Sequence, residues 1–244
     1  MKVAIIGATS AIAHETAKCF ARDGAQLFLV GRSPEKLTAV ADDLKVRGAQ
    51  QVETFQLDVD ELDHHQELFE AILKTFDELD ILFIAHGTLG DQRKSELSVA
   101  ETLKELTTNF TSVISLLTIG ANYFEQRQRG CIAVISSVAG DRGRGSNYVY
   151  GTAKAGVSTF LQGLRSRFAR SKVVVLTIKP GFVDTPMTAS FKKGPLFAQP
   201  GPVGRDIYKA MQQGKDVVYV PGFWRLIMFV VKAIPEGIFK RLSF

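Results

Sequence analysis

The sequence predicts an α/β protein with a doubly wound sheet of about seven parallel strands and helices on both faces. Three observations support this fold class. Short apolar runs recur at regular intervals, the segments between them have helical periodicity, and a glycine-containing turn follows the first run. The runs are continuously apolar rather than alternating, which is typical of parallel strands that helices cover on both sides.

The order of these segments predicts the secondary structure along the chain. Strands are expected at 2–7, 26–31, 52–57, 80–85, 131–136, 172–178 and 216–220. Helices are expected at 11–23, 34–47, 62–77, 96–128 and 149–170. No linker or internal repeat interrupts the pattern, so a single domain is expected over 1–244. Segment 185–202, rich in Pro, Gly and Ser/Thr, is the longest irregular stretch and is expected to be a substrate lid.

Composition narrows the classes of partner. The 244 residues are 45% hydrophobic and carry a net charge of +5, with basic residues spread along the chain. Nucleic acid binding is therefore not indicated, whereas an anionic ligand or an anionic membrane surface fits the charge. Cys19 and Cys131 lie in apolar runs and are expected to be buried thiols of a reducing compartment. No signal-peptide pattern is seen, so we expect a cytoplasmic protein.

The turn after the first predicted strand, IIGATSAIA (5–13), suits a pyrophosphate. Gly7 permits a tight turn, Thr9 and Ser10 can cap the next helix, and the helix N-terminus offers free N–H groups to an anion. The usual G-x-G-x-x-G pattern is absent, since alanines occupy the later glycine positions. The expected cofactor residues here are Gly7, Thr9, Ser10, Ala11 and Ile12.

The end of the second predicted strand indicates which dinucleotide is bound. An acid at this point would bind the ribose 2′-hydroxyl of NAD, but the sequence has Arg32 and Ser33. A guanidinium pairs with a 2′-phosphate, so NADP(H) is predicted over NAD(H), with an ordinary exposed loop charge as the alternative. After the third strand, Asp58 and the adjacent Val59 are expected at the adenine, although Asp58 would equally suit a helix cap.

Tyr150 and Lys154 stand four residues apart in YVYGTAKAG (148–156), so in a helix they share one face. A neighbouring positive charge favours the phenolate and lowers the pKa of a tyrosine from its reference of about 10. Such a pair can exchange a proton with a substrate. The alternative is a solvated helix face, because this spacing is common by chance.

Several segments together resemble the short-chain dehydrogenase/reductase family. They follow the family's order and spacing, and they are the turn at 7–13, LDV (57–59), IAHG (84–87), Asn109, ISSVAG (135–140), YGTAK (150–154) and KPGFVDTPM (179–187). The resemblance covers nearly the whole chain. It implies a single Rossmann-type domain with a substrate loop after the sixth strand.

The resemblance also implies a catalytic set of four residues. Tyr150 would be the general acid in reduction, donating its proton to the carbonyl oxygen while hydride arrives from the nicotinamide. Lys154 would lower the pKa of this tyrosine and hold the nicotinamide ribose, and Ser137 would polarise the substrate oxygen. Asn109 would help to hold a water through which a proton reaches the lysine. Residues implied at the nicotinamide end are Pro180, Gly181, Val183 and Thr185.

The sequence departs from the family pattern after the fourth strand. The usual Asn-Ala-Gly is replaced there by Ala85, His86 and Gly87. By their place in the family pattern, these three residues are still expected to bind the cofactor. The His86 ring is expected to replace the asparagine hydrogen bonds that steady this loop.

Other polar residues carry weaker predictions. Arg142 and Arg144 lie where the family builds its substrate mouth, where they would attract a phosphate or carboxylate unless they are solvated loop charges. His64 and His65 are expected at the surface, and no set of His and Cys has the spacing of a metal site.

The C-terminal segment 221–244 is an apolar tail interrupted by Arg225, Lys232 and Pro235. It is too short and too interrupted to span a bilayer, which takes about 20 apolar residues. Its aromatic and basic residues fit a helix lying in a membrane interface. A subunit interface or a cover over the active site are the alternatives.

The sequence therefore predicts an NADPH-dependent oxidoreductase that transfers hydride between the nicotinamide and a carbonyl or secondary alcohol. The alternatives are a catalytically silent dinucleotide sensor of the same fold, and a reductase of lipid-linked sugars at a membrane surface. A nucleotide-sugar epimerase is disfavoured, because such chains are longer and carry an added substrate domain. By resemblance, a homodimer or homotetramer is expected through the long helices 96–128 and 149–170.

Overall fold

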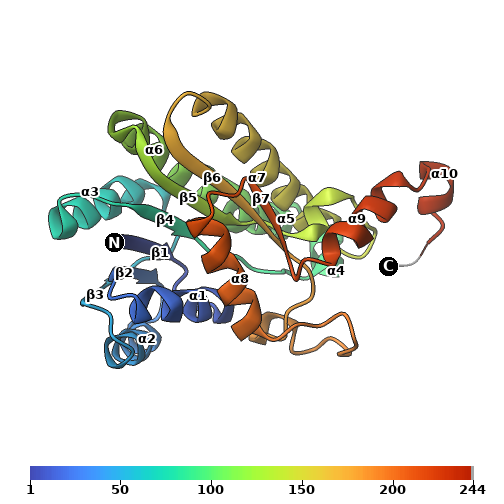
Figure 1. Ribbon diagram of the computed structural model, residues 1–244. Helices are drawn as coiled ribbons and strands as arrows, with labels where there is room; N and C mark the ends of the chain where they lie inside the picture. The colour runs from blue at the N-terminus through green and yellow to red at the C-terminus, as the bar shows by residue number, and fades with distance from the viewer. Residues whose placement is uncertain (243–244) are drawn as a thin grey trace.

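The computed structural model describes residues 1–242, and its strands form one parallel sheet in the order β3-β2-β1-β4-β5-β6-β7 (Figure 1). The strands are β1 (Lys2–Ile6), β2 (Gln26–Gly31), β3 (Gln51–Gln56), β4 (Ile81–Ile84), β5 (Arg129–Ile135), β6 (Lys172–Pro180) and β7 (Val217–Val220). The predicted doubly wound α/β fold is confirmed. The strand order reverses between β1 and β4, and a doubly wound sheet opens its ligand crevice at such a switch point.

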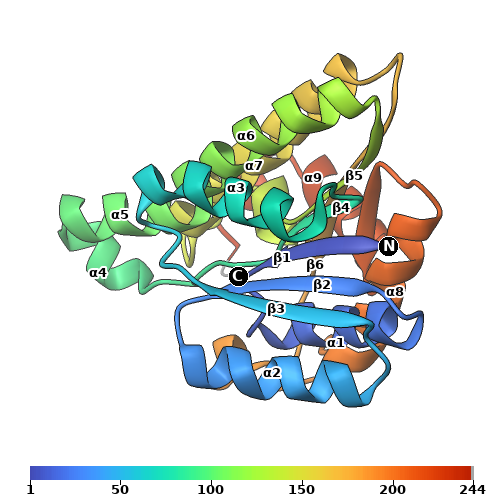
Figure 2. The same ribbon diagram turned by 90° about the vertical axis from the view of Figure 1, so that its left-hand side faces the viewer.

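Helices cover both faces of the sheet (Figure 2). They are α1 (Ala11–Arg22), α2 (Pro34–Val46), α3 (His65–Phe76), α4 (Gln92–Leu97), α5 (Val99–Leu106), α6 (Ser112–Arg127), α7 (Tyr148–Arg167), α8 (Pro200–Gln212), α9 (Trp224–Ala233) and α10 (Glu236–Phe239). In β1, Val3 and Ile5 pack toward α1, α2 and α8, whereas Ala4 and Ile6 pack toward α3, α6 and α7. Burial on both faces explains why the strands are apolar without alternation.

The predicted helix 96–128 is divided in the structure. Ser98 has an extended backbone that ends α4, and its hydroxyl caps α5 by accepting from the N–H of Glu101. Between α5 and α6 the chain makes a π-helical turn over Thr107–Thr111. Such single turns recur at functional sites, and this one contains Asn109.

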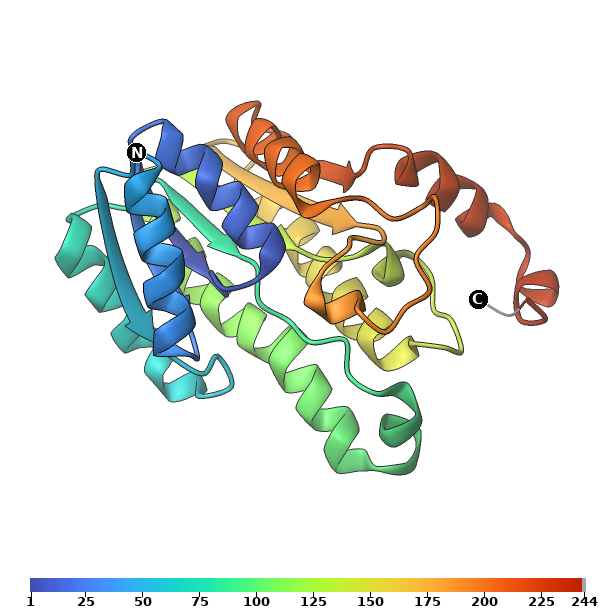
Figure 3. The same cartoon turned by 90° about the horizontal axis from the view of Figure 1, so that it is seen from below.

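Helix α8 was missed by the sequence analysis, and the irregular segment ends at 199 rather than 202. Two prolines, at 200 and 202, made the start of α8 look like loop. Proline is tolerated there because the first helical N–H groups have no intrahelical acceptor. Residues 183 and 198 pair in an isolated bridge, which brings the start of the segment close to its end. Figure 3 shows the segment as the orange loop that precedes α8.

Two expectations about burial differ in outcome. Both cysteines are free and buried, as predicted. His64 is exposed as expected, but His65 is completely buried, where its ring nitrogens contact Ser115 Oγ at 2.9 Å and Val59 O at 3.0 Å. The surface prediction for His65 was wrong because these two partners satisfy a neutral ring inside the protein.

The described part of the tail, 221–242, forms α9 and α10, which extend away from the body (Figure 1). Trp224 and Met228 nevertheless pack into a small core with Val138. Residues 243–244 of the predicted tail lie outside the described residues. Within 1–242, every helix is too short or too polar to cross a membrane.

Candidate active site

A cleft of about 490 Å³ lies at the carboxyl ends of the strands, and the loops after β1 to β6 all contribute to it. It brings together most of the predicted site. The predicted residues that line it are Gly7, Thr9, Ser10, Ala11, Ile12, Arg32, Asp58, Val59, Ala85, His86, Gly87, Ser137, Tyr150, Lys154, Pro180, Gly181, Val183 and Thr185.

The first turn packs tightly against the loop after β4. Gly7 has a φ of 80°, and a Cβ on it would lie 2.6 Å from the backbone nitrogen of His86. Glycine suits this position because it adopts a positive φ without strain and has no Cβ to clash with His86. Ser10 is the N-cap of α1 and accepts from the N–H of Ala13 at 3.2 Å. The N-terminus of α1 therefore faces the cleft and suits an anion.

The end of the cleft that lies beside the loop after β2 and the start of α2 carries two basic side chains. Arg32 is exposed, with Nη1 3.8 Å from Asp58 Oδ2. Lys36, in the first turn of α2, lines the same end and was missed by the sequence analysis, although RSPEK places it one helical turn after the arginine loop. Asp58 accepts from the N–H of Asp60 at 3.1 Å in a local turn and caps no helix.

Ser33 is the one predicted cofactor residue that does not line the cleft. It is the N-cap of α2, accepting from the N–H of Lys36 at 3.3 Å and donating to Glu35 Oε2 at 2.8 Å. Its side chain caps α2 directly after Arg32, and its contact with the cofactor stays a prediction.

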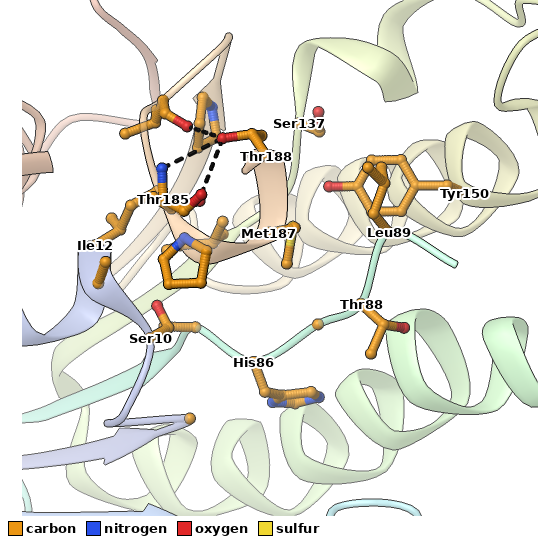
Figure 4. Close-up of a pocket in the computed structure, with 18 of the residues that line it drawn as sticks. Ser10, Ile12, His86, Thr88, Leu89, Ser137, Tyr150, Thr185, Met187 and Thr188 are labelled. Carbon is orange, nitrogen blue, oxygen red and sulfur yellow. Dashed lines mark hydrogen bonds between the residues drawn. The ribbon is translucent and has the colours of Figure 1, made fainter. Parts of the chain in front are cut away.

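Tyr150 and Lys154 share one face of α7, and both line the cleft. The ammonium nitrogen lies 5.7 Å from the centre of the tyrosine ring and donates to the carbonyl of Ile135 at 3.2 Å. Figure 4 shows the tyrosine hydroxyl pointing into the cleft on the side of Met187, with Ser137 nearby. Because the chain brings these side chains together, a proton donor and a cation share one wall of the cavity.

Burial changes the acidity of this pair in the opposite direction to the prediction. Removal from water raises the pKa of Tyr150 to about 12, although its hydrogen bond with Ser137 opposes this effect. Burial also lowers the pKa of Lys154 to about 8. The expected acidification of Tyr150 by Lys154 is therefore not found in the protein alone. Burial disfavours the charged form of each side chain, which is the phenolate for Tyr150 and the ammonium for Lys154.

Asn109 lies behind the cleft wall instead of lining it. Its Oδ1 accepts from the N–H of Thr88 at 3.1 Å, and its Nδ2 donates to Glu105 Oε1 at 2.7 Å. A Cβ on Gly87 would lie 2.7 Å from Asn109 Oδ1 and 3.3 Å from Lys154 Nζ. The missing side chain at Gly87 thus lets the amide oxygen and the ammonium approach the same point.

Comparison with known proteins identifies the family. The model of the short chain dehydrogenase family matches residues 1–195. The chain belongs to the short-chain dehydrogenase family. It is therefore an oxidoreductase with the Rossmann-type fold, which binds a nicotinamide dinucleotide.

Relatives and solved structures agree with this assignment. An uncharacterized oxidoreductase of Mycobacterium tuberculosis is 34% identical over 240 residues, 98% of this chain and 96% of the relative. One of Streptomyces coelicolor is 31% identical over 239 residues, 98% and 94% of the two chains. An alcohol dehydrogenase of Thermococcus sibiricus, complexed with 5-hydroxy-NADP, has a TM-score of 0.80 at 23% identity, over 90% of this chain and 95% of its own. A variant of actinorhodin polyketide ketoreductase with NADPH also has a TM-score of 0.80 at 24% identity, over 91% of this chain and 96% of its own.

The short-chain dehydrogenase carries His86 where its family usually has asparagine. The ring points away from Tyr150 toward α6, and Nε2 contacts Ser112 Oγ at 2.8 Å (Figure 4). The Ser112 hydroxyl donates to the carbonyl of Thr108 at 2.7 Å, so His86 must be the donor to it. Burial, helped by the positive charge of Lys154, lowers the pKa of His86 to about 3. A neutral His86 thus ties the loop to α6.

Arg142 does not lie at the substrate mouth of the short-chain dehydrogenase, and that expectation was wrong. Its Nη1 donates to the carbonyl of Val231 at 2.8 Å, and Nη2 pairs with Glu236 at 3.0 Å. Its guanidinium carbon lies 3.7 Å from the centre of the Phe239 ring. Arg142 therefore anchors the tail, because those acceptors and the ring attract it away from the cleft. Arg144 does line the cleft, as expected.

The first half of the predicted lid, from Thr185 to Phe191, contributes residues to one side of the cleft. Thr188 Oγ1 donates to the carbonyl of Val183 at 2.6 Å and accepts from the N–H of Thr185 at 3.2 Å (Figure 4). These bonds hold the short helical turn at 186–188 beside the cavity. The apolar residues that line this side, and that the sequence analysis did not assign to the site, are Val138, Phe182, Met187 and Phe191.

Proposed function

We propose that the protein transfers hydride between NADPH and the carbonyl carbon of a small molecule, or catalyses the reverse oxidation of a secondary alcohol. The observation that carries the proposal is the grouping of Ser137, Tyr150 and Lys154 at one end of a cleft whose other end holds Arg32 and Lys36. In NADPH the nicotinamide stands at one end of the molecule and the 2′-phosphate near the other, so the cofactor would match both ends of the cleft. The apolar substrate side favours a carbonyl compound with an apolar body.

The residues present fit the cofactor. Gly7 lets the first turn pack against the backbone of His86, and the N-terminus of α1, capped by Ser10, would face the pyrophosphate. Arg32 and Lys36 would hold the 2′-phosphate, and Lys154 would hold the nicotinamide ribose. When bound, the dinucleotide supplies or accepts the hydride.

The chain's own residues would orient the substrate oxygen and move the proton. Ser137 would hold the carbonyl oxygen, and Tyr150 would donate its proton to that oxygen in reduction. The raised pKa of Tyr150, about 12, keeps the phenol protonated at neutral pH, as a proton donor requires. Asn109 would support the return of a proton through Lys154, whose pKa of about 8 lets it exchange protons near neutrality.

The direct test measures loss of NADPH absorbance with a panel of ketones, sugars and lipid-linked carbonyls, together with camphorquinone as an activated diketone. Turnover of any member supports the proposal. Tight NADPH binding without reduction of any member would count against the proposal and favour the dinucleotide sensor.

We further propose that the tail contacts an anionic membrane surface, which would suit carbonyl substrates held in a bilayer. Large apolar side chains are exposed along it, and they are Phe223, Leu226, Phe229, Val230, Ile238 and Leu242. Exposed basic residues accompany them, and they are Arg225, Lys232, Lys240 and Arg241. Apolar burial combined with attraction to anionic headgroups is how interfacial helices bind.

Replacing Leu226 and Phe229 by aspartate is expected to weaken binding to phosphatidylglycerol vesicles at least about tenfold, because both side chains would lose apolar burial. Each is 70% exposed, so the fold should tolerate the change. Val46→Asp is the matched control, since Val46 is 89% exposed at the end of α2. Equal co-sedimentation of the double variant and the intact chain would exclude the contact.

We also propose a homodimer or homotetramer assembled through the α4–α7 region. Leu97, Val99 and Leu103 support it as large apolar side chains exposed on α4 and α5. Leu103→Asp is expected to lower the mass measured by light scattering to that of a smaller assembly. A wild-type chain that is already monomeric at micromolar concentration would contradict the proposal.

A further inference from the structure

A buried carboxylate lies directly behind the catalytic residues, and no step above uses it. Glu105, in the last turn of α5, is 8% exposed. Glutamate is almost never so buried without partners. Its Oε2 accepts from the Thr88 hydroxyl at 2.8 Å, and its Oε1 accepts from Asn109 Nδ2 at 2.7 Å. A Cβ on Gly90 would lie 2.7 Å from the carboxylate carbon, so the loop after β4 is shaped around this group.

The carboxylate is one of three groups that set which way the Asn109 amide points, because Nδ2 also donates to the backbone carbonyl of Glu105 at 3.2 Å and Oδ1 accepts from the N–H of Thr88. An ionised carboxylate only accepts hydrogen bonds, so it must face the NH₂ group of Asn109. The amide oxygen then faces the N–H of Thr88, at 3.1 Å, and the space beside Gly87 where Lys154 Nζ also lies. Together these contacts, with the Glu105 carboxylate as the only charged one, present an acceptor oxygen and not a donor toward the ammonium.

The charges around Glu105 couple it to the catalytic pair. Burial raises the pKa of Glu105, the positive charge of Lys154 from α7 lowers it, and Asp60 from the loop after β3 raises it. The loop after β4 adds the uncharged Thr88. In turn, the negative charge of Glu105 raises the pKa of both Lys154 and Tyr150.

We propose that Glu105 is a positioning residue of this oxidoreductase, which orients the Asn109 amide and acts as the buried counter-charge of Lys154. The proposal rests on the proposed function. It assigns a role to a fifth residue behind the Asn109, Ser137, Tyr150 and Lys154 set.

The test compares Glu105→Gln with Glu101→Gln. Glutamine keeps the shape of Glu105 and can still accept from Asn109, but it removes the charge. Glu101 is exposed on the same helix, so its variant removes an equal charge away from the site. The titration of Lys154 is followed by NMR with carbon-labelled lysine, and its signal is assigned by its loss in Lys154→Arg. This readout needs no substrate.

Glu105→Gln is expected to move the Lys154 titration about one pH unit lower, because a stabilising negative charge is lost. The alkaline limb of NADPH-dependent carbonyl reduction should move in the same direction, since reduction needs a protonated Tyr150 and the glutamate raises its pKa. Glu101→Gln should match the wild type in both measurements.

An unchanged Lys154 titration in a folded Glu105→Gln variant overturns the inference, even if the variant has a lower Tm. A wild type that binds NADPH but reduces no carbonyl defeats the proposed function instead. The two failures are therefore distinguishable, because the first is seen in the titration and the second in turnover.

Discussion

Replacing Tyr150 by phenylalanine is expected to lower carbonyl reduction about a thousandfold, the scale of a lost general acid. The ring remains to fill its place beside Lys154, so the cleft should keep its shape. Only the hydroxyl, the proposed proton donor, is missing. NADPH should still bind with little change in Kd, measured by fluorescence titration alongside turnover of the best carbonyl in the panel.

Tyr148→Phe is the matched control for this experiment. Tyr148 begins the same helix, is 44% exposed and does not line the cleft. Its variant should keep wild-type turnover. If Tyr150→Phe retained most of the activity while its fold was intact, another group would have to donate the proton, and the assignment of Tyr150 would be wrong.

The sequence predicted those features that depend on local pattern. Buried parallel strands must be apolar on both faces, so the seven strands were found with small errors at their ends. The four-residue spacing of Tyr150 and Lys154 placed both side chains on one helix face, because a helix turns every 3.6 residues. The predicted cofactor residues follow the parallel strands, and the loops at the carboxyl ends of such strands meet at one edge of the sheet, which is why the structure brings most of them together.

Features set by distant contacts could not be predicted in this way. Arg142 turns to the tail because backbone carbonyls about 90 residues further along the chain accept its hydrogen bonds. Glu105 looked like an ordinary polar position of a helix, and only folding placed it under Thr88 and Asn109. Neither contact leaves a periodic signal in the sequence.

The acidity of Tyr150 shows the same limit in energetic terms. Sequence spacing indicated a cationic neighbour, which favours a lower pKa, but not the burial that raises it. Desolvation depends on how much protein surrounds the phenol, and the spacing of two residues carries no information on that. In the folded chain, burial is the largest influence on the pKa of this tyrosine.

Replacing Arg32 by aspartate is expected to change the preference between NADPH and NADH by about a hundredfold in favour of NADH, as the loss of a charge-assisted pair implies. Arg32 is 67% exposed and lines the cleft beside Asp58, so the change leaves the core intact. The new carboxylate would stand next to the existing one, and both would repel a 2′-phosphate. The ratio of the two dissociation constants, measured by fluorescence titration, gives the result without a substrate.

Lys45→Asp is the matched control, because it makes the same change of charge on α2 at a residue that does not line the cleft. The ratio of the NADPH and NADH dissociation constants should be the same for Lys45→Asp as for the wild type. An unchanged ratio in Arg32→Asp would contradict the role of Arg32 in choosing between the two dinucleotides, and Lys36, the other basic side chain at this end of the cleft in residues 1–242, would be the next residue to replace. A large shift, by contrast, would place phosphate recognition in the arginine loop, where the prediction from sequence put it.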